Sequence, residues 1–415
     1  MSSPYPNAER WPVAIAGVVL QVCLGTVYAW SFFQKPITEA YGWSNESVTW
    51  VFSLAICFLG LAAAFGGIQL SRGKASPRTL ALTGTVLFAV GHFIGALALW
   101  KSQLWLLWLG YGVIGGMGLG LGYVVPVATA AKWFPDKKGF ITGMVVMGFG
   151  FGALLMSKVL APLAMQIFAG NLALVFAGLG IVFAVAAPFA ALFMKNPPDQ
   201  TPRQESVATP ADQDTGKIAW KSFVLLWLLF FCNIFVGIAI ISFQSPLLQD
   251  LLQQKNAAIT PAELAAHGAT LIAISAIFNG LGRFMWGAVS DRIGQSLAFS
   301  LLMGTQFFAF GLLLVTRNPL FFGILVCYVL LCYGGGFGTI PSYISAIFGA
   351  RRMAFLYGII LTAWSAAGIA GPKFMAWLRD THSSDTAVQY AFGFSAVLLL
   401  IGLAFSFLPA IRTRK

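Results

Sequence analysis

One arginine stands inside a stretch of sequence that is otherwise apolar enough to cross a membrane. The stretch runs from Leu271 to Arg292, and Arg283 lies in its inner half. A charge at such a depth costs about 2.5–3.5 kcal/mol on insertion scales, so it usually has a function and a partner. The planar guanidinium fork matches a carboxylate, so the chemistry that Arg283 indicates is recognition of an anion.

None of the 13 acidic residues is placed to neutralise Arg283. Each one falls in or beside a polar connection between apolar segments: Glu9, Glu39, Glu46, Asp136, Asp199, Glu205, Asp212, Asp214, Asp250, Glu263, Asp291, Asp380 and Asp385. Buried charges are normally paired. We therefore expect the anion of Arg283 to arrive as a substrate. The alternative is a structural contact between Arg283 and backbone carbonyls at a helix end.

Several polar and aromatic residues are candidates to complete a binding site around Arg283. Asn279 precedes it by four residues and shares its helix face, although an interhelical hydrogen bond would explain Asn279 equally well. Tyr123 and Tyr333 adjoin two corresponding glycine runs, and they either donate hydroxyls to a carboxylate or pack as core aromatics. Four further aromatics form the predicted apolar wall around a small organic tail, with ordinary helix packing as the alternative: Tyr28, Trp30, Phe337 and Trp364.

Composition places the 415-residue chain in a membrane. It is 58% hydrophobic and 9% charged, with a mean hydropathy of +0.82, whereas soluble domains average roughly 25% charged residues. The formal net charge is +12. The basic residues lie in short connections, so they indicate membrane topology and not nucleic-acid binding. The pattern contains no metal-ligand spacing, nucleotide-binding motif or catalytic cluster, so we predict neither an enzyme nor a cofactor.

Twelve apolar segments predict an all-α protein with twelve transmembrane helices. They span roughly residues 12–33, 48–70, 79–100, 104–128, 139–163, 171–194, 220–245, 264–289, 296–316, 320–344, 354–377 and 388–409. Each is near the ~20 residues that a membrane span needs. The polar stretch at 195–219 predicts a flexible cytoplasmic linker between six-helix halves at 1–194 and 220–415.

The distribution of Lys and Arg predicts the orientation. With the N-terminus inside, 17 of the 25 basic residues fall in inner connections and 7 on the outer side. This bias places both termini in the cytoplasm, and we expect the protein in a bacterial inner membrane as a monomer. Lys158 and Lys373 lie near the outer ends of their helices. They either extend to the lipid headgroups or form a basic vestibule that attracts anions.

The two halves repeat one another in sequence. Pro126 matches Pro341 at an offset of 215, and the basic pair Lys137-Lys138 matches Arg351-Arg352 at an offset of 214. A duplicated unit of this kind places a binding site between the halves near the midplane. Rocking of the halves then exposes that site to either side of the membrane in turn.

Three stretches resemble a known family. Gly287 to Gly294 (GAVSDRIG) resembles the loop signature of the major facilitator superfamily, although the first-half copy lacks the acid. Gly25 to Trp30 (GTVYAW) resembles the helix-1 signature of monocarboxylate transporters. The stretch from Trp133 to Gly139 (WFPDKKG) resembles their helix-5 signature and that of bacterial oxalate/formate antiporters. The resemblance implies two six-helix halves related by a pseudo-two-fold axis, and secondary transport of small monocarboxylates such as lactate or pyruvate.

The chain departs from that family pattern at two positions. Monocarboxylate transporters commonly carry an Asp four residues before the helix-8 arginine, where this chain has Asn279. Oxalate exchangers carry a second cation in helix 11, where this chain has Trp364 after Tyr357-Gly358…Thr362-Ala363. A dianion would therefore face one positive charge, and the resemblance favours a monocarboxylate.

The sequence leaves more than one coupling mechanism and more than one class of function open. A proton could travel on the substrate or through His92, although a packed neutral histidine is the other interpretation of His92. The carboxylate could instead be exchanged for another anion, as in an oxalate/formate antiporter. Two other classes are a membrane sensor that binds a carboxylate and a membrane enzyme. The repeat argues against the sensor, and the lack of converging acid, base and nucleophile argues against the enzyme.

Overall fold

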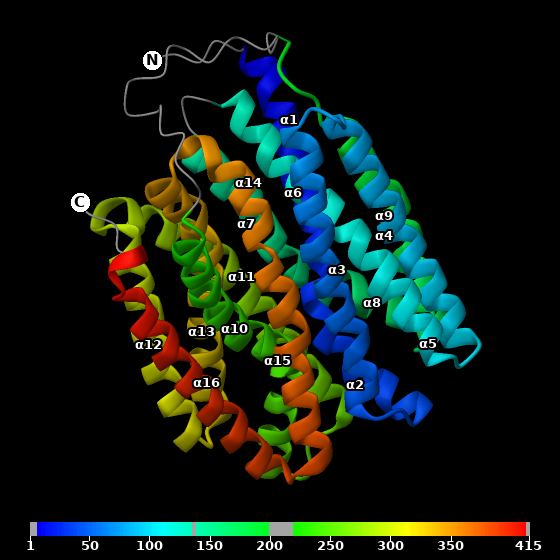
Figure 1. The fold of residues 1–415 in the computed structure, drawn as a ribbon. Helices are drawn as coiled ribbons and strands as arrows, with labels where there is room; N and C mark the ends of the chain where they lie inside the picture. Colours follow the sequence, from blue (N-terminus) through cyan, green and yellow to red (C-terminus); the bar gives the residue numbers. More distant parts are fainter. Residues whose placement is uncertain (1–5, 135–137, 199–218, 412–415) are drawn as a thin grey trace.

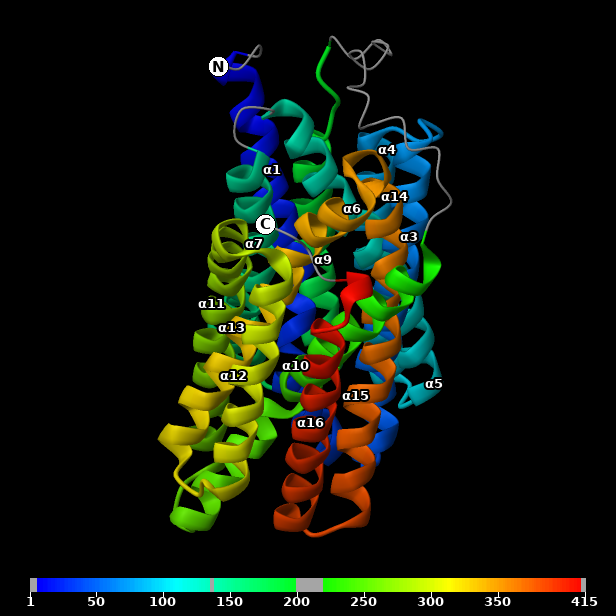
Figure 2. The ribbon, with the colours of Figure 1, turned by 60° about the vertical axis from the view of Figure 1, so that its left-hand side comes forward.

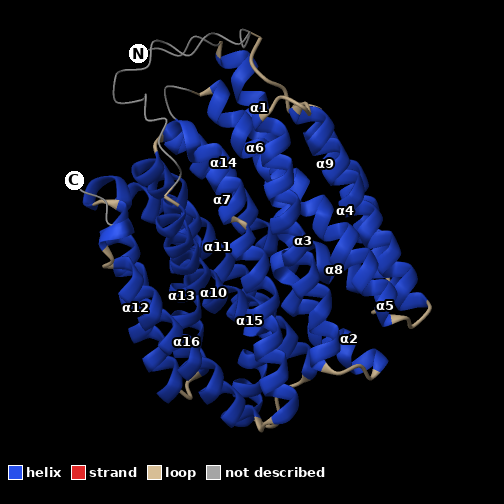
Figure 3. Ribbon diagram, in the orientation of Figure 1, coloured by secondary structure: helices blue, strands red, loops and turns tan. Residues whose placement is uncertain are grey.

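The computed structural model describes residues 6–134, 138–198 and 219–411. Within these ranges the secondary structure is helical and contains no strand, and 12 helices are long and apolar enough to cross a membrane. Figures 1 and 3 show them gathered into one bundle. The prediction of an all-α membrane protein with twelve spans is confirmed.

The first six spans contain several interruptions of the regular α-helix. Their elements are α1 (Asn7–Gly25), the 3₁₀ turn η1 (Thr26–Ala29), α2 (Trp30–Tyr41), α3 (Asn45–Ser71), α4 (Pro77–Trp100), α5 (Leu104–Leu107), the π-helical η2 (Trp108–Gly115), α6 (Gly116–Trp133), α7 (Lys138–Leu155), the π-helical η3 (Met156–Leu160), α8 (Ala161–Ile167) and α9 (Leu172–Ala191). The first span thus continues from α1 through η1 into α2.

The last six spans are mostly single helices. They are α10 (Trp220–Lys255), α11 (Pro261–Ile293), α12 (Gln295–Val315), α13 (Pro319–Phe348), α14 (Ala350–Ile360) followed by α15 (Thr362–Thr381), and α16 (Ser384–Ser406), before the 3₁₀ turn η5 (Pro409–Ile411). The predicted linker at 195–219 lies for the most part outside the described residues.

Helix ends extend beyond the predicted apolar segments where the flanking sequence is polar. The first span reaches Tyr41 and the seventh reaches Lys255, because amphipathic turns continue each helix after its apolar run ends. The eighth span begins at a capping box, whose sequence is Thr260-Pro261-Ala262-Glu263. Thr260 accepts a hydrogen bond from the backbone of Glu263, whose side chain accepts one from the Thr260 backbone. These reciprocal bonds satisfy N–H groups that a helix start leaves without partners.

Two glycines of α13 bring that helix against α11. A Cβ atom at Gly334 would collide with the carbonyl oxygen of Asn279, and one at Gly338 would collide with the carbonyl oxygen of Arg283. Small residues of this kind let membrane helices approach until their backbones touch. The glycine run of α13 therefore fixes the position of the two α11 residues singled out in the sequence.

The first and last six spans face each other along two helix pairs. Helix α3 packs along α15, and α7 packs along α11. Figure 1 shows these helices in the middle of the bundle, with α4 and α9 on one flank and α12 and α16 on the other, and Figure 2 shows the same bundle turned by 60°. Residues of α7, α11 and α13 that point inward therefore meet residues of the first span between the two groups of helices.

Candidate functional site

Arg283 is buried between the two groups of helices, with 2% of its surface exposed. Its Nη1 donates to the Tyr123 hydroxyl at 3.3 Å, and its Nε donates to the Asn279 carboxamide oxygen at 3.5 Å. The Nη2 group has no hydrogen-bond partner in the part of the chain that the structure describes. Among the described residues no carboxylate forms an ion pair with Arg283. The cation thus retains unused N–H donors.

Aromatic rings surround the guanidinium group. Its carbon lies 4.8 Å from the ring centre of Phe337 on α13 and 5.6 Å from that of Phe149 on α7. The indole of Trp364 packs against Phe337 with ring centres 4.7 Å apart, and against Tyr123 at 5.4 Å. The indole N–H of Trp364 also lacks a partner among the described residues. The rings stabilise the cation by cation–π attraction and exclude water from it.

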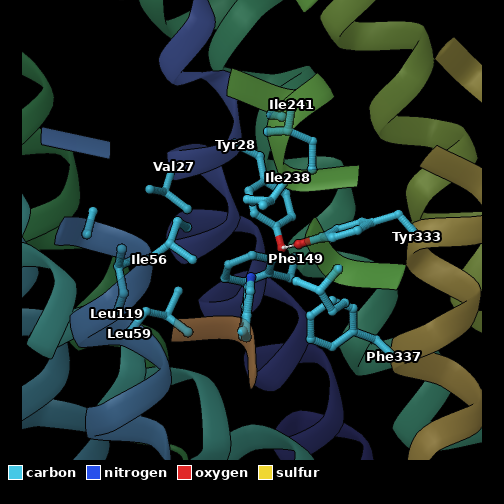
Figure 4. Close-up of a cluster of buried hydrophobic side chains, with 14 of the residues drawn as sticks. Val27, Tyr28, Ile56, Leu59, Leu119, Phe149, Ile238, Ile241, Tyr333 and Phe337 are labelled. Atoms are coloured by element: carbon cyan, nitrogen blue, oxygen red, sulfur yellow. Dashed lines mark hydrogen bonds between the residues drawn. The ribbon is translucent and has the colours of Figure 1, made fainter. Parts of the chain in front are cut away.

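A pair of tyrosines joins the two groups of helices next to these rings. The hydroxyls of Tyr28, in η1, and Tyr333, in α13, are 2.6 Å apart, and either can donate. Figure 4 shows both rings pointing toward each other, with Phe149 and Phe337 close by. Together with the bond from Arg283 to Tyr123, this pair closes the space around the guanidinium. The structure is therefore occluded at this level.

The structure brings together seven of the eight residues that the sequence singled out. They are Arg283, Asn279, Tyr123, Tyr333, Tyr28, Phe337 and Trp364. Trp30 lies apart from them. Its indole N–H donates to Gln34, and its ring packs on Tyr111 at 5.1 Å. Two residues along a helix correspond to about 200° of rotation, so Tyr28 and Trp30 point to different sides.

Sequence reasoning did not identify Phe149 or the pair formed by Gln244 and Ser275. Phe149 contacts Tyr28, Tyr123 and Trp364, but a phenylalanine in an apolar helix carries no feature that separates it from its neighbours. Gln244 was detectable, because an amide inside an apolar segment is expensive to bury without partners.

A small cavity adjoins the site on the side toward the start of α11. Its volume is about 10 Å³, which is room for about one water molecule. The lining residues come from both groups of helices: Tyr28, Ala153, Ile241, Gln244, Ile272, Ser275, Ala276, Asn279 and Leu330. Two of these, Tyr28 and Asn279, also belong to the cluster around Arg283. The cavity therefore lies directly beside the cluster.

His92 lies away from this cluster. Its ring is buried among Phe88, Tyr111, Phe176 and Phe183, and its Nδ1 is 2.9 Å from the Phe88 carbonyl oxygen. These contacts are all within the first six spans. The packed interpretation of His92 fits this environment, and a relay to Arg283 has no contact to support it.

Charged residues connect the two groups of helices at the end of the bundle where α2 joins α3. Lys373 of α15 forms an ion pair with Glu46 of α3. The backbone N–H of Glu46 donates to Asp380 at 2.7 Å, and Lys35 lies 3.5 Å from the Gln249 side-chain oxygen. Lys373 is therefore a partner in a contact between helices. It neither extends to the headgroups nor stands as an isolated vestibule charge.

Comparison with known proteins matches most of the chain to one protein family. The sequence model of the Major Facilitator Superfamily matches residues 15–372. An oxalate:formate antiporter of Oxalobacter formigenes is 26% identical over 388 residues, which are 91% of this chain and 87% of that protein. Apicoplast pyruvate carrier 1 of Toxoplasma gondii is 27% identical, covering 91% of this chain and 85% of the carrier. Human monocarboxylate transporter 11 is 24% identical, and the match covers 97% of this chain and 83% of that transporter.

Solved structures agree on the fold. A D-xylose-proton symporter superposes with a TM-score of 0.71 at 15% identity, over 98% of this chain and 100% of that one. A bacterial homologue of the lysosomal transporter Spinster, in an inward-facing and occupied conformation, gives 0.68 at 18% identity, over 99% and 98%. At these identities the likeness concerns the fold alone. The curated relatives named here are transporters, which confirms that the chain falls in a non-enzymatic class.

Proposed function

We propose that the chain, which belongs to the Major Facilitator Superfamily, is a secondary active transporter of small monocarboxylates. Lactate and pyruvate are the expected kind of substrate. Arg283 anchors the carboxylate, and the site opens alternately to either side as the halves rock. We further propose that both termini face the cytoplasm of a bacterial cell and that net transport moves acid, with the proton carried on or beside the substrate.

The observation that carries this proposal is the Nη2 group of Arg283. It is a buried N–H donor of a buried cation, and it has neither a hydrogen bond nor a paired carboxylate among the described residues. Leaving a buried donor unsatisfied costs about 1–3 kcal/mol, and the cost is higher when the donor is charged. A carboxylate bound by two parallel N–H bonds removes this cost and neutralises the charge.

The surroundings of Arg283 favour one carboxylate over two. Trp364 occupies the helix position at which the family resemblance implies a second cation in oxalate exchangers. It packs against the rings of Phe337, Tyr123, Phe149 and Tyr28. A second carboxylate placed there would be buried without a counter-charge, at a cost of several kcal/mol. A short apolar or neutral tail meets no such penalty.

An anion exchanger of the oxalate/formate type is the second candidate. It is supported by the 26% identity to the oxalate:formate antiporter over most of both chains. A counterflow panel of labelled carboxylates in proteoliposomes separates the two candidates. Lactate or pyruvate should compete strongly and oxalate poorly. Oxalate as the tightest competitor would reverse the choice between them.

A further inference from the structure

We infer that Gln244 of α10 and Ser275 of α11 form a second polar subsite, which receives a neutral oxygen of the carried acid. This inference rests on the proposed function, because it assigns the part of the substrate that lies beyond the carboxylate at Arg283. It makes Gln244 a residue that determines specificity.

The first support is a buried amide with an unused end. Gln244 is 2% exposed and Ser275 is fully buried. The Ser275 hydroxyl donates to the Gln244 carboxamide oxygen at 2.7 Å. The amide nitrogen of Gln244 donates to none of the described residues. Because Gln244 lines a cavity, its N–H₂ group can donate to water or to a ligand there.

The second support is the position of this amide. Gln244 and Ser275 line the small cavity that also includes Tyr28 and Asn279. Those two residues contact Tyr333 and Arg283, respectively, so the cavity lies next to the carboxylate site. Tyr28 and Ala153 come from the first six spans and the other lining residues from the last six. The subsite thus lies between the halves, where a carried molecule must sit.

The third support is the spacing along α11. Ser275, Asn279 and Arg283 follow one another at intervals of four residues, so they share a face and rise by about 6 Å per step. The Arg283 side chain reaches back to Asn279, as its Nε bond shows. Its guanidinium therefore lies about one helical turn from Ser275. A small acid with an oxygen a few bonds from its carboxylate spans that interval.

The chemistry of the subsite selects a neutral oxygen. No Lys or Arg is among the residues that line the cavity. The free amide N–H of Gln244 matches a hydroxyl or carbonyl oxygen, whereas a second carboxylate would remain without a counter-charge there. The substrate class is therefore a small hydroxy- or oxo-carboxylic acid.

The test compares acids that differ by a single oxygen. Binding of butyrate, 2-hydroxybutyrate and 3-hydroxybutyrate to the purified full-length protein is measured by competition in counterflow and by thermal shift. The wild type should bind the better hydroxy acid about tenfold more tightly than butyrate, because unpaired polar groups in the site penalise the acid that lacks the oxygen. Gln244→Leu should bring this ratio close to one.

Two variants keep the test decisive. Ser275→Ala removes the partner that orients Gln244 and should lower the ratio even if Gln244→Leu does not fold. Gln306→Leu removes an equally buried glutamine of α12 that does not line the cavity, and it should keep the wild-type ratio. The inference is wrong if the wild type shows no preference, if neither subsite variant changes the ratio, or if both lower the affinities for all three acids equally. A wild type that binds lactate but none of the three acids would overturn this inference alone, and one that binds none of the four would defeat the proposed function as well.

Discussion

The Arg283 guanidinium is held by interactions that are each weak. Its hydrogen bonds to Tyr123 and Asn279 measure 3.3 and 3.5 Å, longer than the usual 2.7–3.2 Å. Cation–π contacts with Phe337 and Phe149 add about 0.5–2 kcal/mol each. These terms keep a weakly hydrated cation in place without satisfying all its donors. The residue is oriented for a ligand that the described part of the chain does not supply.

Replacement of Arg283 tests this interpretation. Arg283→Ala removes one partner of a buried charge pair in the bound state, a change that typically costs about 2–5 kcal/mol, or at least about 30-fold in affinity. Arg283→Lys keeps the charge but loses the planar fork, so its affinity should lie between those of the wild type and the Ala variant. Thermal-shift binding and counterflow with lactate measure the effect. Wild-type affinity in a well-folded Ala variant would defeat the anchor assignment.

At the level of helices, the site depends on how closely α13 approaches α11. Gly334 and Gly338 leave space for the carbonyl oxygens of Asn279 and Arg283. Tyr333 and Phe337 each precede one of these glycines by one residue. The close contact between the two helices therefore sets where Tyr333 and Phe337 lie relative to the guanidinium. Added volume at this contact should disturb the site as well as the packing.

We expect Gly338→Ala to destabilise the protein by about 1–3 kcal/mol, since an added methyl group in a packed contact forces the backbones apart. Transport should fall with it, because Phe337 moves relative to Arg283. The matched control is Gly304→Ala in α12, where an added Cβ meets no atom of the described residues within 4 Å. Thermal unfolding and lactate counterflow are measured for both. A Gly338→Ala variant as stable and active as the control would contradict this account of the contact.

The membrane spans, one helix start and the lone buried charge could be predicted from the sequence, because short stretches of residues determine them. The directions in which aromatic side chains point could not be predicted. The twelve spans follow from apolar length, and the start of α11 follows from the capping box at Thr260. The lone charge of Arg283 also stands out by itself. Trp30 and Phe149 differ: one faces away from the site and the other lines it. Rotation about the helix axis and the 3₁₀ turn at η1 decide this, and the residue types do not reveal it.

At the level of the whole molecule, the ion pair between Glu46 and Lys373 closes one end of the bundle. Glu46 lies in the first turn of α3 and Lys373 lies in α15, so the pair joins the first and last six spans. Glu46 is also held through its backbone N–H by Asp380. Alternating access requires these contacts to break when that end opens. If the proposed alternating access holds, we expect the pair to favour the state in which this end is closed.

Glu46→Gln should shift that equilibrium toward opening. The side chain of Lys373 is 16% exposed and that of Glu46 is 47% exposed. We therefore expect the substitution to change the free-energy difference between the two states by about 1 kcal/mol, or roughly fivefold in population. Spin labels at Ser44→Cys and Ser384→Cys, in a background without native cysteines, report the distance across this end. In the Glu46→Gln variant, the longer distance between the two labels should gain population. High salt should produce a similar shift in labelled protein that keeps Glu46. Distance distributions that ignore both changes would show that the pair does not control this end.

Coupling to protons is also a property of the whole cycle. A proton symporter usually keeps an ionisable acid in its pathway. The ion pairs of the described carboxylates lie at the α2–α3 end and not at Arg283. An arginine does not release its proton in proteins. The remaining carriers are the substrate, which holds a proton more readily in a desolvated site, and His92.

The packing of His92 leads us to expect that the proton travels on or beside the substrate. Its ring is enclosed by aromatic side chains of the first six spans and does not contact the cluster around Arg283. His92→Gln should therefore keep uptake of lactate driven by an inward proton gradient. The measurement uses proteoliposomes with and without a trapped counter-anion. Loss of gradient-driven uptake in a folded His92→Gln variant that still exchanges lactate would assign the relay to His92. Uptake by the wild type that requires the trapped anion and ignores the gradient would establish an obligatory exchanger, because each inward carboxylate would then need an outward anion and no proton.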